Sequence, residues 1–424
     1  MSTINSQLVS TPRILAASLA GTAIEFYDFF IYGTAASLVF GKLFFAAAPA
    51  ATQLLAAYAT FSVAFVARPI GALAFGHFGD RVGRKSTLIA SLLLMGLSTM
   101  AIGLLPTYAQ VGWSAPVLLC LLRFGQGVGL GGEWGGAALL ATENAPAAFR
   151  GRYGMFPQLG APVGFIAANG FFLVLSLLLS PAQFSAWGWR IPFLASVVLV
   201  GLGLWVRTRL TETPVFAAAL AAAPPLRVPA ATLLKNHPRE TLAGTLAVVA
   251  AFAIFYLTTT FTLGYATTSL AYDRGEFLEV LLIAMPFLAC GILCSGVWSD
   301  RRNPRFVLIA GCGAAVPLGF MLGPALTSGS LTVIWLFLSA ALFLMGLVYG
   351  PLGAWMPSLF PARVRYTGVS LAFTVGGILG GGIAPIVAQS LAIHGGLPWV
   401  GCYMSAAALV SLVALVLLAR PATR

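Results

Sequence analysis

Charged residues are scarce in this chain of 424 residues, where Asp, Glu, Lys and Arg together make up only 8%. Soluble domains carry about 25% of these residues, so the composition excludes an ordinary soluble protein. Hydrophobic residues make up 59%, and the mean hydropathy is +0.94. This excess of apolar residues also excludes a disordered chain, and it excludes a nucleic-acid-binding protein despite the formal net charge of +12.

Cysteine and histidine are also rare, with five cysteines and three histidines. All five cysteines lie in apolar stretches, where a thiol behaves as a small hydrophobic group, so the sequence predicts no disulfide framework. Cys290 and Cys294 would share one helix face, but no histidine or acidic residue stands beside them. We expect no metal site and no cofactor, and the sequence has no nucleophile elbow or phosphate-binding loop of an enzyme.

Long apolar runs, in contrast, are abundant, and short charged turns separate them. A membrane-spanning helix needs about 20 apolar residues, and twelve runs of this kind can be counted. Strands of an outer-membrane barrel would instead alternate polar and apolar residues over about 10 positions. We therefore predict an all-α membrane protein with twelve spans near residues 14–40, 53–75, 86–106, 116–142, 153–179, 190–207, 241–270, 278–298, 306–326, 330–355, 367–392 and 398–419.

Basic residues are distributed unevenly between the two sides of this predicted bundle. Of the 23 lysines and arginines, 18 fall on the side of the N-terminus, three on the opposite side and two inside spans. Loops rich in Lys and Arg stay on the cytoplasmic side of a membrane. We therefore expect a multi-pass protein of the inner or plasma membrane with both termini in the cytoplasm.

The two halves of the chain repeat short motifs in the same order. GHFGDR at 76–81 returns as GVWSDR at 296–301, each between the second and third spans of its half. RGRY at 150–153 returns as RVRY at 363–366, and one Ala-Pro pair also recurs a span later. Three matches in one order indicate a duplicated six-span unit, which is a common plan of transporters.

The longest cytoplasmic connection divides the chain between these two units. We predict an N-terminal six-helix bundle at 1–207, a cytoplasmic central loop at 208–240 and a C-terminal six-helix bundle at 241–424. In transporters built from paired repeats, the substrate is held near the membrane midplane between the halves.

Several motifs are similar to those of a known transporter family. GHFGDRVGRK at 76–85 resembles the complete signature loop of the major facilitator superfamily. Four further segments resemble the metabolite:proton symporter branch of this superfamily, namely RFGQGVGLGGEWGG (123–136), EFYDF (25–29), Arg68-Pro69 and ETPVF (212–216). This branch includes permeases for α-ketoglutarate, citrate, shikimate, and proline or betaine.

The resemblance implies the major facilitator fold, in which two pseudo-symmetric six-helix bundles carry a small molecule by alternating access. It also implies an inner gate that includes Gly76, Asp80, Arg81, Gly83 and Arg84 of the signature loop, with Glu143 and Arg150. Asp300 and Arg301 stand at the matching place in the second half, where the following RNPR departs from the family pattern. For Lys85 and Arg152 we favour simple anchoring at the membrane surface.

Five ionisable residues lie inside the predicted spans, namely Glu25, Asp28, Arg68, Arg123 and Glu133. Insertion of a charge at a helix centre costs roughly 2.5–3.5 kcal/mol, so five facing lipid would cost on the order of 12–18 kcal/mol. We therefore expect them to face the interior, where their depths permit Asp28–Arg123 and Arg68–Glu133 pairs. The alternative is a purely structural network that fixes helix packing.

Chemistry suggests roles for these residues. A carboxylate near an arginine can hold or release a proton as solvent access changes, so the proton-coupling candidates are Glu25, Asp28 and Glu133. Arg123 would neutralise a deprotonated acid or bind a substrate carboxylate, because a guanidinium suits both. The other substrate-binding candidates of the first half are Tyr32, Gln126 and Arg68.

The second half has no acidic or basic residue in the interior of its spans. Its substrate-binding candidates are therefore aromatic or polar, namely Tyr256, Thr260, Tyr349 and Trp355, with Thr259, Tyr265, Thr374 and Gln389 as further polar groups. This asymmetry suggests that proton coupling resides in the first half and selection of substrate shape in the second.

The sequence thus predicts a proton-coupled symporter that imports a small polar metabolite, in the first place an organic acid, and functions as a monomer. Two alternatives within transport stay open, namely proton-antiport efflux and uptake of a zwitterion such as betaine or proline. A channel and a membrane enzyme are further classes. Saturable uptake that depends on a pH gradient would separate a carrier from a pore.

Overall fold

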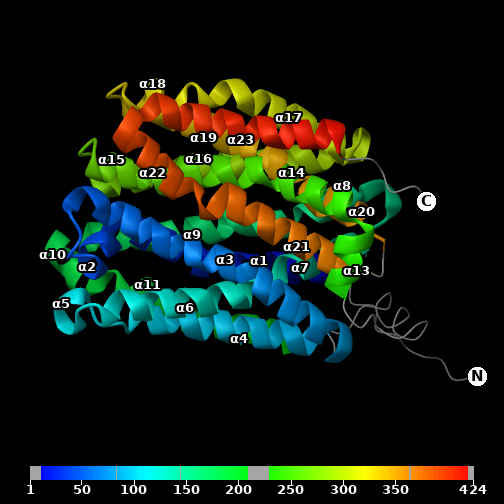
Figure 1. Cartoon of the computed structure of the whole chain (residues 1–424), viewed down its shortest axis with the longest axis horizontal. Coiled ribbons are helices and arrows are strands. Elements are labelled where there is room, and N and C mark those ends of the chain that lie inside the picture. Colours follow the sequence, from blue (N-terminus) through cyan, green and yellow to red (C-terminus); the bar gives the residue numbers. More distant parts are fainter. Residues whose placement is uncertain (1–10, 83, 144, 209–228, 362–363, 419–424) are drawn as a thin grey trace, which may run out of the picture.

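A computed structural model of the chain describes residues 11–82, 84–143, 145–208, 229–361 and 364–418 (Figure 1). Every regular element in these ranges is a helix, and the long helices run along the long axis of the molecule (Figure 1). The predicted all-α class is therefore confirmed. The predicted central loop lies mostly outside the described residues, and its last part forms the short helix α13 (Pro229–Asn236).

The first half forms six helical passages along the long axis. In order these are α1 (Thr11–Ala35) with η1 (Ala36–Phe40) and α2 (Gly41–Phe44); α3 (Ala50–Val82); α4 (Arg84–Gly103); α6 (Ser114–Leu130) with α7 (Glu133–Glu143); α8 (Arg150–Met155) with η3 (Pro157–Leu159) and α9 (Gly160–Leu178); and α11 (Arg190–Thr208). Short turns connect them, namely α5 (Tyr108–Val111), η2 (Ala147–Phe149), α10 (Pro181–Gln183) and η4 (Phe184–Gly188).

The second half repeats this plan with six further passages. In order these are α14 (Pro238–Tyr256) with η5 (Leu257–Phe261) and α15 (Thr262–Thr268); α16 (Arg274–Arg301); α17 (Pro304–Gly319) with α18 (Leu322–Leu326); α19 (Leu331–Tyr349) with α20 (Leu352–Ser358); α21 (Arg365–Gly377) with η6 (Ile378–Gly382) and α22 (Ala384–Gly395); and α23 (Leu397–Leu417). The elements η1, η4, η5 and η6 are π-helical turns inside or beside longer helices.

The apolar content of these passages matches the predicted spans. Nine helical stretches in the described residues are long and apolar enough to cross a membrane. A tenth consists of Pro181–Gly188 and Arg190–Trp205, which meet at a bend of 44°. Two shorter apolar helices, Ile89–Gly103 and Pro304–Gly319, fall at the predicted third and ninth spans. All twelve predicted spans thus correspond to helices of the structure.

The predicted charge asymmetry is present in the fold. Lys42 lies in α2, Arg190 begins α11 and Arg274 begins α16; α2 and the starts of these two helices lie at the end of the bundle drawn on the left in Figure 1. The helices α8, α13 and α20 lie at the other end, which we call the basic end because α8 begins at Arg150 and α16 ends at Arg301 (Figure 1).

Glycines let the helices of the first half approach closely. A Cβ at Gly127 would lie 2.6 Å from the Cα of Ala64 in α3, and one at Gly129 would lie 2.9 Å from the backbone nitrogen of Met95 in α4. The glycines of α6 therefore bring its backbone against two neighbouring helices at once. Small residues serve this purpose in membrane bundles, because lipid supplies no hydrophobic drive for helices to associate.

Candidate functional site

All five ionisable residues predicted inside the spans are buried. Asp28 and Arg123 have no exposed surface, and the exposed fractions of Glu25, Arg68 and Glu133 are 6%, 6% and 3%. They come from α1, α3, α6 and α7, which pack together in the first half. The side chains therefore face the interior of the bundle, as the insertion cost requires.

Gln126 organises the most deeply buried part of this group. Arg123 donates a hydrogen bond from its guanidinium to Oε1 of Gln126, one turn further along α6. Nε2 of Gln126 donates to the backbone oxygen of Asp28 at 3.0 Å and to Oγ1 of Thr99 at 2.8 Å. Every polar atom of this amide therefore has a partner, and the amide links three helices.

The direct Asp28–Arg123 pair that depth permits is not formed. Within the described residues no ion pair joins Asp28 to Arg123, and neither carboxylate oxygen accepts a hydrogen bond from the guanidinium. The reason is geometric, because Gln126 lies between them and takes the guanidinium hydrogen bond while contacting only the backbone of Asp28.

Aromatic rings surround both buried arginines. The guanidinium carbon of Arg123 lies 3.9 Å from the ring centre of Tyr32, 4.5 Å from that of Phe29 and 5.1 Å from that of Phe61. The guanidinium carbon of Arg68 lies 4.5 Å from the same Phe29 ring. Cation–π attraction is strongest where water is excluded, so these rings stabilise charges that have little contact with solvent.

Arg68 also lines a cavity between the two halves. This small polar cavity is lined by Glu25, Arg68, Leu130, Gly131, Trp134, Gly135, Ser370, Phe373 and Thr374. Glu25 lies within electrostatic range of the Arg68 guanidinium. Across the cavity, the rings of Trp134 and Phe373 stack in parallel with their centres 3.6 Å apart. An acid and a base from the first half thus meet small hydroxyl groups from the second.

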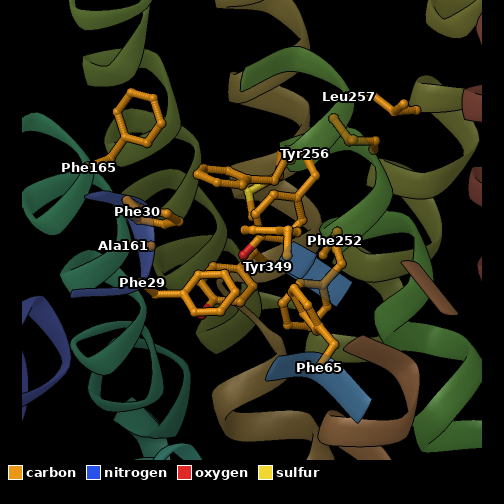
Figure 2. Packing of buried hydrophobic residues seen from close by; sticks show 14 of the residues in the cluster. Phe29, Phe30, Phe65, Ala161, Phe165, Phe252, Tyr256, Leu257 and Tyr349 are labelled. Atoms are coloured by element: carbon orange, nitrogen blue, oxygen red, sulfur yellow. The ribbon is translucent and has the colours of Figure 1, made fainter. Parts of the chain in front are cut away.

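A second small cavity, which we call the aromatic cavity, also lies at the boundary of the two halves. It is lined by Phe26, Phe30, Ala161, Phe252, Phe255, Tyr256, Met345 and Tyr349. Figure 2 shows Tyr256 and Tyr349 between Phe30 and Ala161 of the first half and Phe252 of the second. Two of the tyrosines named from the sequence therefore lie in a cavity wall.

The remaining substrate-binding candidates lie elsewhere. Tyr32 is fully buried, with its face against Arg123 and its hydroxyl 2.5 Å from Oγ1 of Thr60. Trp355 is buried in α20, which packs on α7 and α8 towards the basic end. Thr260 lies in η5, where its carbonyl accepts a hydrogen bond from the hydroxyl of Tyr58. None of the three lines the polar or the aromatic cavity.

At the basic end, Asp300 joins the two halves. Its Oδ1 accepts a hydrogen bond from the backbone nitrogen of Gly151 at 2.7 Å, and its Oδ2 lies 3.1 Å from Nε of Arg152. From the sequence we expect Arg150 in this gate and Arg152 as an anchor at the membrane surface, but the structure places Arg152 beside Asp300 and leaves Arg150 exposed. The difference arises because neighbouring residues of α8 point in different directions, and only one faces α16.

The other predicted gate residues that the structure describes lie at the ends of α3, α4, α7 and α16. Gly83 lies outside the described residues, while Gly76, Asp80 and Arg81 fall in α3 and Arg84 begins α4. Glu143 is the last residue of α7 and is partly buried, and Arg301 is the exposed last residue of α16.

At the opposite end, hydroxyl groups of the first half bind a backbone carbonyl of the second. The hydroxyl of Tyr58 in α3 donates to the Thr260 carbonyl at 2.8 Å, and the hydroxyl of Ser37 in η1 donates to the same oxygen at 3.1 Å. Ser62 likewise donates to the carbonyl of Gly382 in η6. A π-helical turn shifts the usual helical pairing, and such turns are frequent at functional sites.

Sequence reasoning missed the aromatic side chains of this site. Phe29, Phe61 and Phe65 contact the arginines, and Phe26 and Phe30 line the aromatic cavity. One signal is available in the sequence, since the pairs 26/30 and 61/65 are spaced i, i+4 and therefore form aromatic faces on α1 and α3. The described residues contain no cluster of three or more His, Cys, Asp or Glu that could hold a metal ion.

Comparison with known proteins places these features in a family. A family model described as Major Facilitator Superfamily matches residues 18–385. The inner membrane metabolite transport protein YhjE of Escherichia coli (strain K12) is 50% identical over 414 residues, covering 96% of this chain and 94% of that protein. The shikimate transporter of the same organism is 36% identical over 404 residues, covering 94% and 92%. Its proline/betaine transporter is 32% identical over 389 residues, covering 89% and 77%.

Solved structures agree with the fold. The partially occluded inward-open conformation of the xylose transporter XylE from E. coli matches with a TM-score of 0.76 and 16% identity, covering 98% of this chain and 99% of that one. At this identity the match shows the fold alone, and it confirms two six-helix bundles. The relatives are transport proteins and not enzymes, and their names agree with the metabolite:proton symporter branch. The chain is a multi-pass membrane transporter of metabolites and belongs to the major facilitator superfamily.

Proposed function

We propose that this protein imports a small organic acid together with a proton across the inner membrane. The observation that supports this most directly is the polar cavity, in which Glu25 and Arg68 lie within electrostatic range of each other at the boundary of the two halves. A substrate carboxylate bound by Arg68 would compete with Glu25 for the same positive charge. Protonation of Glu25 removes that competition, so proton binding and substrate binding favour each other.

Arg68 is therefore the proposed substrate-binding arginine. Its guanidinium can bind a carboxylate through two parallel hydrogen bonds, and its Nε has no hydrogen-bond partner within the described residues. Arg123 is proposed to have a positioning role, because its guanidinium is held by Gln126 and by the rings of Tyr32 and Phe29.

Glu25 is the leading proposed proton carrier, because it lines the cavity. Asp28 and Glu133 stay candidates, since both are buried on neighbouring helices. An acid that exchanges protons during transport must meet solvent from each side in turn, and helices at the boundary of the two halves can provide that exposure as the halves rock.

We further propose that the basic end faces the cytoplasm, with both termini on that side. The excess of Lys and Arg in the loops of the basic end supports this orientation. The contacts of Asp300 with Gly151 and Arg152 would then belong to the inner gate, and the contacts on the Thr260 carbonyl to the outer gate.

Uptake into proteoliposomes with an imposed pH gradient tests the proposal. A thermal-shift screen of organic acids on the purified protein first selects a binding compound. With one proton carried per monocarboxylate, the cycle is electrically neutral, so one pH unit supports about tenfold accumulation. A membrane potential without a pH gradient would then drive no accumulation. Outward transport against an inward proton gradient would instead establish antiport efflux.

Amide variants identify the proton carrier. Glu25→Gln should abolish accumulation driven by the pH gradient, because a permanently neutral side chain no longer couples proton movement to substrate movement. Exchange of labelled for unlabelled substrate should continue. Asp28→Asn and Glu133→Gln are tested in parallel. The matched control is Glu279→Gln, at an exposed position on α16. If all three amide variants accumulate substrate like the wild type, the assignment of proton coupling to these acids is wrong.

A further inference from the structure

Two arginines from other helices cap the last turn of α23 at the basic end. The carbonyl of Ala414 is the last one that accepts a hydrogen bond from α23 itself, so the next four carbonyls lack a partner within the helix. Arg305 donates from Nε and Nη2 to the first two of them, at 2.9 and 3.2 Å. Arg239 donates from Nη2 and Nε to the last two, at 3.0 and 3.3 Å. Both guanidinium groups are therefore held on one helical turn.

The capping arginines come from the starts of two neighbouring helices. Arg239 is the second residue of α14, and Arg305 is the second residue of α17. Both helices pack beside α23, and all three belong to the second half (Figure 1). The two guanidinium groups therefore stay together when the halves move relative to each other.

These arginines carry more positive charge than their surroundings compensate. The carbonyl end of a helix is equivalent to roughly half a negative charge, against two positive charges here. Of the two acids of the second half at this end, Glu240 lies 3.9 Å from Nδ1 of His237, and Asp300 pairs with Arg152. No ion pair among the described residues involves either capping arginine. Three of the five N–H groups of each guanidinium are left for another acceptor.

Exposed apolar side chains adjoin the same two arginines. Phe306 follows Arg305 in the chain and is 50% exposed, while Leu242, one turn after Arg239, is 48% exposed. Leu417, at the end of α23, is 63% exposed. Because α23 is long and apolar enough to cross a membrane, its last turn lies where the apolar interior of the bilayer gives way to the headgroups. The positive charges and the apolar surface thus meet at headgroup level.

We infer that Arg239 and Arg305 bind the phosphate of an anionic phospholipid in the leaflet at the basic end, with an acyl chain along Leu242, Phe306 and Leu417. A guanidinium group binds phosphate through paired hydrogen bonds. The helix carbonyls already hold both side chains, so binding costs little additional side-chain entropy. This site lies apart from both cavities and does not depend on the proposed function.

Two other ligands share part of this chemistry. A zwitterionic phospholipid presents the same phosphate, but its own positive group offsets the attraction of the arginines. Inorganic phosphate has the charge but no acyl chain, so it gains nothing from the exposed apolar surface. The arrangement therefore favours a lipid that combines a net negative headgroup with acyl chains.

Competition between two lipids on the full chain in a neutral detergent tests the inference. Phosphatidylglycerol and phosphatidylcholine with the same acyl chains are added in equal amounts, and native mass spectrometry compares the first lipid bound. Each basic residue near the surface favours an anionic lipid about fivefold, so two should give a preference of roughly 25-fold for phosphatidylglycerol. Inorganic phosphate at the same concentration should not displace it. Absence of a preference in the wild type, or displacement by inorganic phosphate, would overturn the inference.

Variants locate the site. Arg239→Gln and Arg305→Gln should each lower the preference about fivefold, and together they should abolish it. Arg239→Lys with Arg305→Lys keeps both charges and should retain most of the preference, which separates attraction of the lipid from loss of the helix cap. The matched control is Lys235→Gln with Arg302→Gln, which removes two exposed charges at the same end. An equal loss in this control pair, or a complete loss in the lysine pair, would refute the assignment to these two arginines.

Discussion

Removal of the Tyr58 hydroxyl should open the end of the transporter opposite the basic end. This hydroxyl donates to the Thr260 carbonyl at 2.8 Å across the boundary of the two halves. In Tyr58→Phe the Thr260 carbonyl keeps the Ser37 hydroxyl at 3.1 Å, a donor that it shares with the carbonyl of Gly33 at 2.9 Å. The loss is therefore the net value of one hydrogen bond, about 1 kcal/mol. That energy corresponds to about a fivefold shift of a two-state equilibrium towards the state open at this end.

Labelling of a cysteine buried at this end measures the shift. Leu54 in α3 is 8% exposed and lies against Gly264 in α15, so a cysteine at position 54 becomes accessible only when the halves separate there. In a background without the native cysteines, a membrane-impermeant maleimide should react about five times faster in Tyr58→Phe.

Two further variants make this measurement decisive. Adding Ser37→Ala should increase the rate again, because the Thr260 carbonyl then loses both hydroxyl donors from the first half, and a second hydrogen bond across the boundary is worth about 1 kcal/mol. Tyr265→Phe, whose ring stacks on Phe261 at the same end, is the control and should label like the parent. An unchanged or slower rate in Tyr58→Phe would show that this contact does not hold the end closed.

Three further predictions concern substrate binding, the buried network and the basic end. Arg68→Lys should raise the KM for uptake about tenfold, because an ammonium group cannot form the paired hydrogen bonds of a guanidinium; an unchanged KM would remove Arg68 from the substrate site. Gln126→Leu should lower the midpoint of thermal unfolding in detergent, since it removes three hydrogen bonds worth about 1 kcal/mol or more each. Gln389→Leu, at a buried position where Oε1 has no hydrogen-bond partner among the described residues, should change that midpoint far less, and an equal loss in both would contradict the argument. Gly154→Val should hinder closure of the basic end, because even a Cβ at this position would lie 2.7 Å from a backbone nitrogen of α20. A cysteine introduced at Ser299 should then label faster from that end. Slower labelling would contradict the packing argument.

The spans and the buried ionisable residues could be predicted from the sequence, because both depend on properties local to one segment. Hydropathy identifies a helix that can cross a membrane whatever it packs against. The cost of a charge in lipid likewise forces Asp28 or Arg123 inward without knowledge of its partner.

The partners of those residues could not be predicted in the same way. The rise per residue gives the depth of Asp28 and Arg123 along their helices, but it does not show that Gln126 lies between them. The aromatic residues are harder still, because phenylalanine in a membrane helix is equally suited to lipid. Phe29 is 1% exposed beside two arginines, whereas Phe124 on α6 is 41% exposed, and nothing in their local sequence separates the two cases.

The distribution of groups around the two cavities gives the halves different tasks. The first half supplies Glu25 and Arg68 to the polar cavity, whereas the second supplies most of the wall of the aromatic cavity. Trp134 connects the two, because its ring stacks on Phe373 while its N–H reaches the backbone of Tyr349 through Gln158. A ligand that moves Tyr349 would therefore also move Trp134, whose neighbour in the chain is the buried acid Glu133. One short chain of contacts thus joins Tyr349 of the second half to the neighbour of Glu133 in the first, and separation of the halves must break it at the hydrogen bond from Gln158 to Tyr349, together with the Trp134–Phe373 stack.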